Sequence, residues 1–271
     1  MLKLQQPYFY GVILWFLVCF KWGFVLIYYV KGGFMKNKIK NILFDLDGTL
    51  IQGDQDEFFE IFFKEVMMKY LKQFGGDPNT FKGQFMYAYK CMAENSGKMT
   101  NDEMFYRSLA KATGNTVKKL EYFFVDFYAN EYKNVKFVNK AIPQMIWVLK
   151  YLHDNGYNII LATDPLIPDG AIEFKLSACG IDKKLFSFIT SSSNSKYSKV
   201  SLDYYTEIID KQNLRRDETI MVGNHADKDD LASEAGVKTI LISDYLVNYS
   251  NKKLDNLMTA DEFKEYVIKE F

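Results

Sequence analysis

Two aspartates, Asp45 and Asp47, stand two positions apart in the segment Asp-Leu-Asp-Gly-Thr-Leu at residues 45–50. Residues 40–45 form a short apolar run that predicts a buried strand closed by this polar turn. Side chains two positions apart in an extended chain point the same way, so both carboxylates can face one site while Leu46 faces the core. Paired carboxylates can supply a nucleophile and a general acid or base. The segment therefore predicts a reactive site at the end of a strand.

This motif closely resembles D-x-D-G-T/V, the signature of the haloacid dehalogenase superfamily, and the resemblance covers about residues 35–260. It implies that Asp45 is a nucleophile that forms an aspartyl-phosphate. It implies also that Asp47 protonates the departing alkoxide and then deprotonates the attacking water. Because family members that act on carbon–halogen or carbon–phosphorus bonds need no such acid, Asp47 favours the phosphatases and mutases of the family.

Two further motifs of the family are matched by Thr163 and Lys199. Thr163 ends a predicted strand in the segment Leu-Ala-Thr-Asp-Pro, and the resemblance implies that it hydrogen-bonds the phosphoryl group. Lys199 precedes a predicted helix, with Val200 where the family has proline. The resemblance implies that this lysine offsets charge on Asp45 and on the phosphoryl group. Lys196 is the competing lysine, and the spacing to the helix favours Lys199.

The fourth motif is an acidic loop, Gly-Asn-His-Ala-Asp-Lys-Asp at residues 223–229. Asn224 stands there in place of the aspartate that binds Mg²⁺ in the family. The resemblance implies four protein ligands for Mg²⁺, directly or through water: Asp45, the main-chain carbonyl of Asp47, Asn224 and Asp229. An amide oxygen is still a hard ligand, but it supplies one negative charge fewer. The affinity for Mg²⁺ should therefore fall unless Asp229 or Asp227 compensates.

The rest of the chain must position these motifs. Buried strands are predicted at residues 40–45, 157–163, 185–190, 218–224 and 237–243, and helices at 144–154, 171–178, 202–211 and 229–235. This alternation predicts an α/β fold, a Rossmann-like parallel sheet with helices on both faces. Ligands bind such sheets beyond the carboxyl ends of the strands, where all four motifs lie.

Residues 52–142 differ, because their apolar residues recur at helical spacing without a convincing strand. Breakers at residues 75–78, 95–97 and 114–116 divide them into about four helices. We therefore expect a helical cap at 52–142 inserted into a core formed by 35–51 and 143–271. The many aromatic residues of the insert are interpreted as its core rather than as a substrate surface.

The composition excludes several classes of protein. Lys and Arg together equal Asp and Glu at 34 each, so no basic surface for nucleic acid is expected. Three widely spaced cysteines exclude a disulfide framework and indicate the cytoplasm. His153 and His225, the two histidines of the chain, are too few for a multi-histidine metal site. Neither is assigned a catalytic role.

Residues 1–34 are hydrophobic, and residues 7–30 are apolar except for Lys21. About 20 such residues can cross a bilayer, so one interpretation is a single-pass helical anchor with the catalytic domain in the cytoplasm. The favoured alternative is a wrongly assigned start, with translation beginning at Met35. Residues 31–34, Lys-Gly-Gly-Phe, can be encoded by codons that contain a bacterial ribosome-binding sequence. A buried soluble helix is the third interpretation.

Together these features predict a Mg²⁺-dependent phosphatase that hydrolyses a small phosphorylated metabolite through an aspartyl-phosphate. A phosphomutase of the same family is one alternative. A catalytically weakened binding or regulatory module is another, since Asn224 and Val200 depart from the family pattern. The sequence does not identify the substrate or the oligomeric state. Membrane association is expected only if residues 7–30 are translated and inserted.

Overall fold

The computed structural model describes the chain except for residues 1–11, 21–22, 32–37, 54 and 133–139. The chain divides into two compact units, Met1–Asn37 and Lys38–Phe271, and each is treated by itself. The larger unit contains every motif considered above.

The first unit contains an antiparallel pair of strands, β1 (Val12–Phe20) and β2 (Gly23–Lys31). The hydrophobic helix considered for this region is therefore wrong for these residues. Their β-branched and aromatic composition explains the difference, because such side chains favour strands over helices. Among the residues that the structure describes, no helix has the length and hydropathy needed to cross a membrane. The start proposed at Met35 lies outside the described residues.

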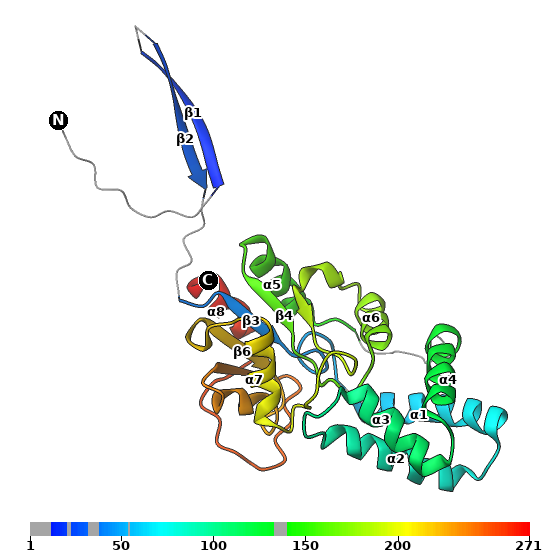
Figure 1. The fold of residues 1–271 in the computed structure, drawn as a ribbon. Coiled ribbons are helices and arrows are strands. Elements are labelled where there is room, and N and C mark those ends of the chain that lie inside the picture. The colour runs from blue at the N-terminus through cyan, green and yellow to red at the C-terminus, as the bar shows by residue number, and fades with distance from the viewer. Residues whose placement is uncertain (1–11, 21–22, 32–37, 54, 133–139) are drawn as a thin grey trace. The chain divides into compact units, whose positions relative to one another are not determined.

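The second unit is built on a six-stranded sheet in the order β5-β4-β3-β6-β7-β8, with every neighbouring pair parallel (Figure 1). The strands are β3 (Asn41–Phe44), β4 (Asn158–Leu161), β5 (Phe188–Ile189), β6 (Thr219–Gly223), β7 (Lys238–Ile242) and β8 (Leu257–Met258). The five predicted strands are confirmed, and β8 was not foreseen. The central strand β3 carries the first motif at its carboxyl end.

Helices cover both faces of this sheet, as predicted. Alternate strand residues pack with α5 (Pro143–Asp154), α6 (Asp169–Ala178) and α8 (Ala260–Glu270) on one face. The intervening residues pack with α7 (Leu202–Lys211) and the 3-10 helix η4 (Asp229–Ser233) on the other. Both faces of the central strands are thus buried, which explains why these strands are apolar runs rather than alternating ones.

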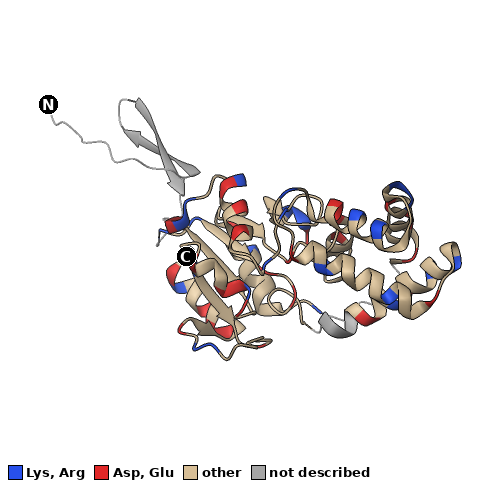
Figure 2. Cartoon of the chain, turned by 60° about the horizontal axis from the view of Figure 1, so that its bottom comes forward, with Lys and Arg blue, Asp and Glu red and all other residues tan. Residues whose placement is uncertain are grey.

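Four helices lie between β3 and α5: α1 (Gln55–Phe74), α2 (Pro78–Ala93), α3 (Asn101–Thr113) and α4 (Val117–Asn130). We call them the insert. The side chains of Asp77 and Thr116 cap α2 and α4, and Thr100 with Glu103 forms a capping box on α3. Basic and acidic residues are interspersed along the helices of the unit (Figure 2).

The insert has a hydrophobic core of its own, in which aromatic rings pack edge to face. Phe105 is central to it, with ring centroids 5.4 Å from both Phe85 and Phe124. Much of the aromatic enrichment is therefore core, as expected.

The end of α2 and the start of α3 join the insert to the rest of the unit. The side chain of Asn101, which is fully buried, donates to the main-chain carbonyls of Pro165 (3.0 Å) and Tyr197 (3.1 Å). Asn95 donates in turn to the side-chain oxygen of Asn101 at 3.0 Å. The hydroxyl of Ser198 donates to the carbonyl of Ala93 at 2.6 Å. These bonds hold the insert against the loops that follow β4 and β5.

Candidate active site

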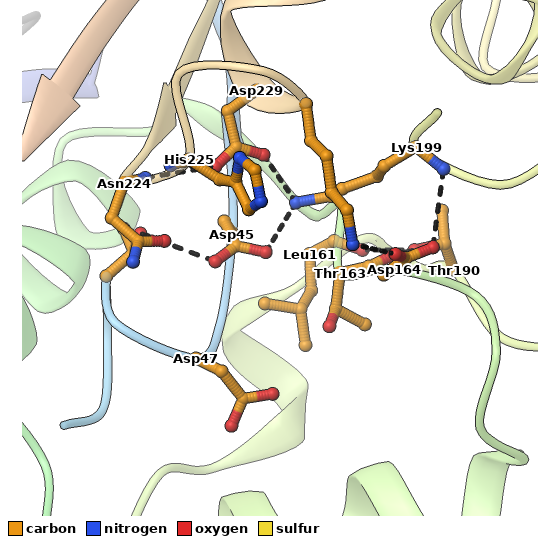
Figure 3. A network of polar contacts seen from close by, with 12 residues as sticks. Asp45, Asp47, Leu161, Thr163, Asp164, Thr190, Lys199, Asn224, His225 and Asp229 are labelled. Carbon is orange, nitrogen blue, oxygen red and sulfur yellow. Dashed lines mark hydrogen bonds and ion pairs between the residues drawn. The ribbon is translucent and has the colours of Figure 1, made fainter. Parts of the chain in front are cut away.

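Asp45 lies directly after β3, and its main-chain N–H donates to the carbonyl of Val222 on β6 at 2.9 Å. Its side chain is 6% exposed and contacts the ammonium group of Lys199 (Figure 3). The same ammonium group donates to Asp229 at 2.7 Å. One lysine, itself 2% exposed, therefore joins two of the predicted carboxylates. By contrast, Lys196 is exposed, so the structure places Lys199 rather than its competitor in the site.

Both carboxylate oxygens of Asp229 are engaged. One accepts from Lys199, and the other accepts from the main-chain N–H groups of Asn224 (3.0 Å) and His225 (2.9 Å). A Cβ at position 223 would lie 2.2 Å from that second oxygen, so glycine is required for this approach. The sequence predicted Asp229 as a metal ligand. In this structure it joins Lys199 to the loop after β6, and its role as a metal ligand stays a prediction.

Asn224 points its side-chain carbonyl oxygen toward the Asp45 side of the site. Its amide group donates to the main-chain carbonyl of Tyr245 at 2.6 Å. The hydroxyl of Thr49 lies 3.4 Å from the side-chain oxygen of Asn224 and 3.4 Å from a carboxylate oxygen of Asp45. Gly48 has φ +84°, and a Cβ there would lie 2.0 Å from the Asn224 amide nitrogen. The Asp45 and Asn224 oxygens therefore converge on one hydroxyl.

These donors suit Mg²⁺, which prefers hard oxygen ligands. Asp45 supplies a carboxylate oxygen and Asn224 an amide oxygen on the same side of the site. Within the described ranges, no group of three or more His, Cys, Asp or Glu side chains is placed to hold a metal ion. Asp45 and Asn224 are thus the side chains whose oxygens would hold a Mg²⁺ ion on this side of the site.

Asp47 has a partner that the sequence analysis did not identify. Lys175 on α6 donates to both of its carboxylate oxygens, at 2.8 and 2.7 Å, and both side chains are buried. Lys175 follows Ala171 and Ile172 on the buried face of the helix. A lysine on an otherwise apolar helical face was the signal that could have revealed this ion pair.

Thr163 is buried after β4, and its main-chain carbonyl accepts from the hydroxyls of Thr190 (2.7 Å) and Tyr204 (2.8 Å). The next residue, Asp164, accepts from the main-chain N–H of Lys199 at 3.3 Å and from Lys228 at 2.9 Å. The loops that carry the second, third and fourth motifs are thus tied together. Asp164 and Lys228 are further site residues that the sequence analysis did not single out.

The site is crowded with negative charge. Burial raises the pKa of Asp45 to about 7; Lys199 opposes this rise and Asp229 adds to it. A cation beside Asp45 would favour its carboxylate form.

Burial, with Lys228, lowers the pKa of His225, so its ring is neutral near pH 7. This loop histidine lines the same cavity as Asp45.

A cavity of about 1040 Å³ connects these residues with the insert. Its lining includes each of the predicted site residues: Asp45, Asp47, Thr163, Lys199, Asn224 and Asp229. Side chains of all four insert helices complete the wall. The fold therefore gathers the four motifs around one cavity.

Comparisons with known proteins agree with this geometry. The family model of haloacid dehalogenase-like hydrolases matches residues 39–236. A structure from Haemophilus somnus, described as a predicted phosphoglycolate phosphatase, is 19% identical with a TM-score of 0.51, covering 86% of this chain and 98% of that chain. L-2-haloacid dehalogenase from Xanthobacter autotrophicus is 12% identical with a TM-score of 0.50, covering 86% and 100%. No curated protein matches the sequence. The chain belongs to the haloacid dehalogenase-like hydrolase family.

Proposed function

We propose that this hydrolase is a Mg²⁺-dependent phosphatase that acts on a small phosphorylated metabolite through an aspartyl-phosphate on Asp45. Residues 35–51 and 143–271 would form the catalytic core, and residues 52–142 the cap. The observation that carries the proposal is the position of Asp45. It is joined to Lys199, and it shares a cavity with a second buried carboxylate, Asp47.

In this mechanism Asp45 attacks phosphorus in line with the leaving oxygen. Lys199 offsets charge on Asp45 and on the phosphoryl oxygens, and the hydroxyl of Thr163 donates to one of them. Asp47 must be a carboxyl to protonate the leaving oxygen and a carboxylate to deprotonate water. Lys175 donates to both oxygens of Asp47 in this structure, so Asp47 would leave Lys175 when substrate binds. When bound at Asp45 and Asn224, Mg²⁺ would neutralise charge on the phosphoryl group.

The test is Mg²⁺-dependent hydrolysis of a generic aryl phosphate. Asp45→Asn is expected to lose about 10³-fold or more of kcat, because the nucleophile is removed. Lys199→Met should lose about 10²-fold or more, whereas the matched variant Lys196→Met should retain wild-type activity. Hydrolysis that persists in Asp45→Asn would contradict the assignment of the nucleophile.

Two alternative functions, a phosphomutase and a binding module, can be distinguished from a phosphatase by experiment. A phosphomutase would return the phosphoryl group to the substrate, which analysis of the products would show. A binding module is favoured by the replacement at Asn224 and by the lack of a carboxylate cluster for a metal among the described residues. Phosphate binding without hydrolysis by the wild-type protein would support that module.

A further inference from the structure

The cavity is large for a compact phosphorylated metabolite. Its volume of about 1040 Å³ lies at the upper end of the roughly 300–1,000 Å³ typical of small-molecule sites. The catalytic residues occupy the end formed by the loops after β3, β4 and β6. The wall continues along residues of all four insert helices, so the cavity has room for more than a compact substrate.

The part of the cavity inside the insert is aromatic. Each of the four helices contributes a phenylalanine to its wall: Phe62 from α1, Phe85 from α2, Phe105 from α3 and Phe124 from α4. Phe105 meets both Phe85 and Phe124 edge to face, at 74° and 75°. Such a wall favours another ring system, which can stack or pack against ring edges.

Within the part of the chain that the structure describes, no basic side chain of the insert lines this end of the cavity. Among the described residues, Asp102 is the one charged side chain of the insert in the cavity wall. The three lysines of the wall come from outside the insert, and each meets a carboxylate: Lys175 with Asp47, Lys199 with Asp45 and Asp229, and Lys228 with Asp164. A substrate with a carboxylate or a second phosphate far from its reacting phosphate would therefore lack a partner.

Three tyrosine hydroxyls supply the polar groups at this end. Tyr89, Tyr106 and Tyr128 line the cavity, and their hydroxyls make no hydrogen bond within the described part of the chain. No described side-chain polar atom is both fully buried and unpaired, so each of these hydroxyls is accessible to solvent. Burial raises the pKa of each phenol, which keeps it neutral. They are therefore suited to hydrogen-bond an uncharged substrate group.

We propose that the substrate is the phosphate monoester of a bulky, uncharged and mainly apolar alcohol. The fit is best for a fused-ring alcohol that carries a further hydroxyl or carbonyl group for the tyrosines. This inference rests on the proposed phosphatase function, because the phosphate must lie at Asp45 for the alcohol to enter the insert.

The test measures binding without hydrolysis, by calorimetry on the full chain with Mg²⁺. The ligands are methylphosphonate, phosphonoacetate and naphthylmethylphosphonate. The naphthyl compound is expected to bind about ten-fold or more tightly than the other two, because its rings become buried. Equal affinities, or tightest binding of phosphonoacetate, would overturn the inference while leaving the phosphatase proposal intact. Failure of all three to bind would overturn both.

A second measurement tests whether the tyrosine hydroxyls of the cavity bind a polar group of the ligand. Tyr128→Phe keeps the ring and should weaken binding of a hydroxyl-substituted naphthylmethylphosphonate several-fold, while leaving the unsubstituted compound unchanged. The matched control is Tyr122→Phe on the same helix, because Tyr122 is 66% exposed. The same comparison with Tyr106→Phe tests a second hydroxyl of the cavity wall. If neither cavity variant discriminates between the two compounds, the role of the tyrosines is contradicted.

Discussion

At the scale of single residues, the site depends on two buried lysines that hold different members of one aspartate pair. Lys199 holds Asp45, and Lys175 holds both oxygens of Asp47. Lys199 could be predicted because it stands at the spacing of a known motif before a helix. Lys175 could not, since its partner is 128 positions away and only the packing of α6 against the sheet brings them together.

The Lys175–Asp47 pair gives a prediction about stability. Lys175→Met should lower the free energy of unfolding by about 3–5 kcal/mol, because it leaves the Asp47 carboxylate buried without its cation. Adding Asp47→Asn should restore much of this loss. Urea denaturation of both variants measures the effect. A double variant no more stable than Lys175→Met would show that the ion pair is not the cause.

Asn224 gives a prediction about metal binding. In Asn224→Asp the new carboxylate oxygen would face the carbonyl of Tyr245, which now accepts from the amide at 2.6 Å. The melting temperature without Mg²⁺ should therefore fall. The increase in melting temperature on adding Mg²⁺ should grow, because the ion gains a charged ligand.

Thermal melts across a Mg²⁺ titration check this, with Asn224→Leu as a control that offers no ligand. A Mg²⁺ response identical in wild type, Asn224→Asp and Asn224→Leu would contradict a role for this side chain in holding the ion.

At the scale of elements, the site residues follow the carboxyl ends of parallel strands, and the connection between α2 and α3 attaches the insert to the neighbouring loops. Hydrophobic runs and glycine-rich breakers were enough to predict five strands and the insert helices, because each is a strong local signal. The strand β8 has two residues, and η4 is a 3-10 helix where an α-helix was expected. Such short elements are determined by tertiary packing, which local sequence patterns do not record.

The attachment of the insert gives a prediction at this scale. Asn101→Ala removes two donors to main-chain carbonyls and should lower the free energy of unfolding by about 1–3 kcal/mol, because buried acceptors lose their partners. Hydrogen exchange of the loop between α2 and α3 should become faster. Asn130→Ala, at the exposed end of α4, is the control. Equal stability of the two variants would show that the Asn101 bonds do not anchor the insert.

At the scale of the whole molecule, Lys38–Phe271 is a compact unit and the family model begins at residue 39. A chain that starts at Met35 is therefore expected to fold with the urea midpoint and aryl phosphatase activity of the full chain. Side-by-side purification and denaturation of the two forms would check this. Loss of folding in the shorter form would show that the first unit contributes to the stability of the second.

The central claim is that Asp45 attacks phosphorus. Its most direct test is mass spectrometry of the wild-type enzyme, quenched in acid during turnover of a phosphate monoester in ¹⁸O-labelled water. The account predicts one phosphoryl group on the peptide that contains Asp45 and the heavy oxygen in inorganic phosphate, because water attacks phosphorus in the second step. An unmodified Asp45 peptide throughout turnover, or heavy oxygen in the Asp45 carboxylate itself, would contradict it.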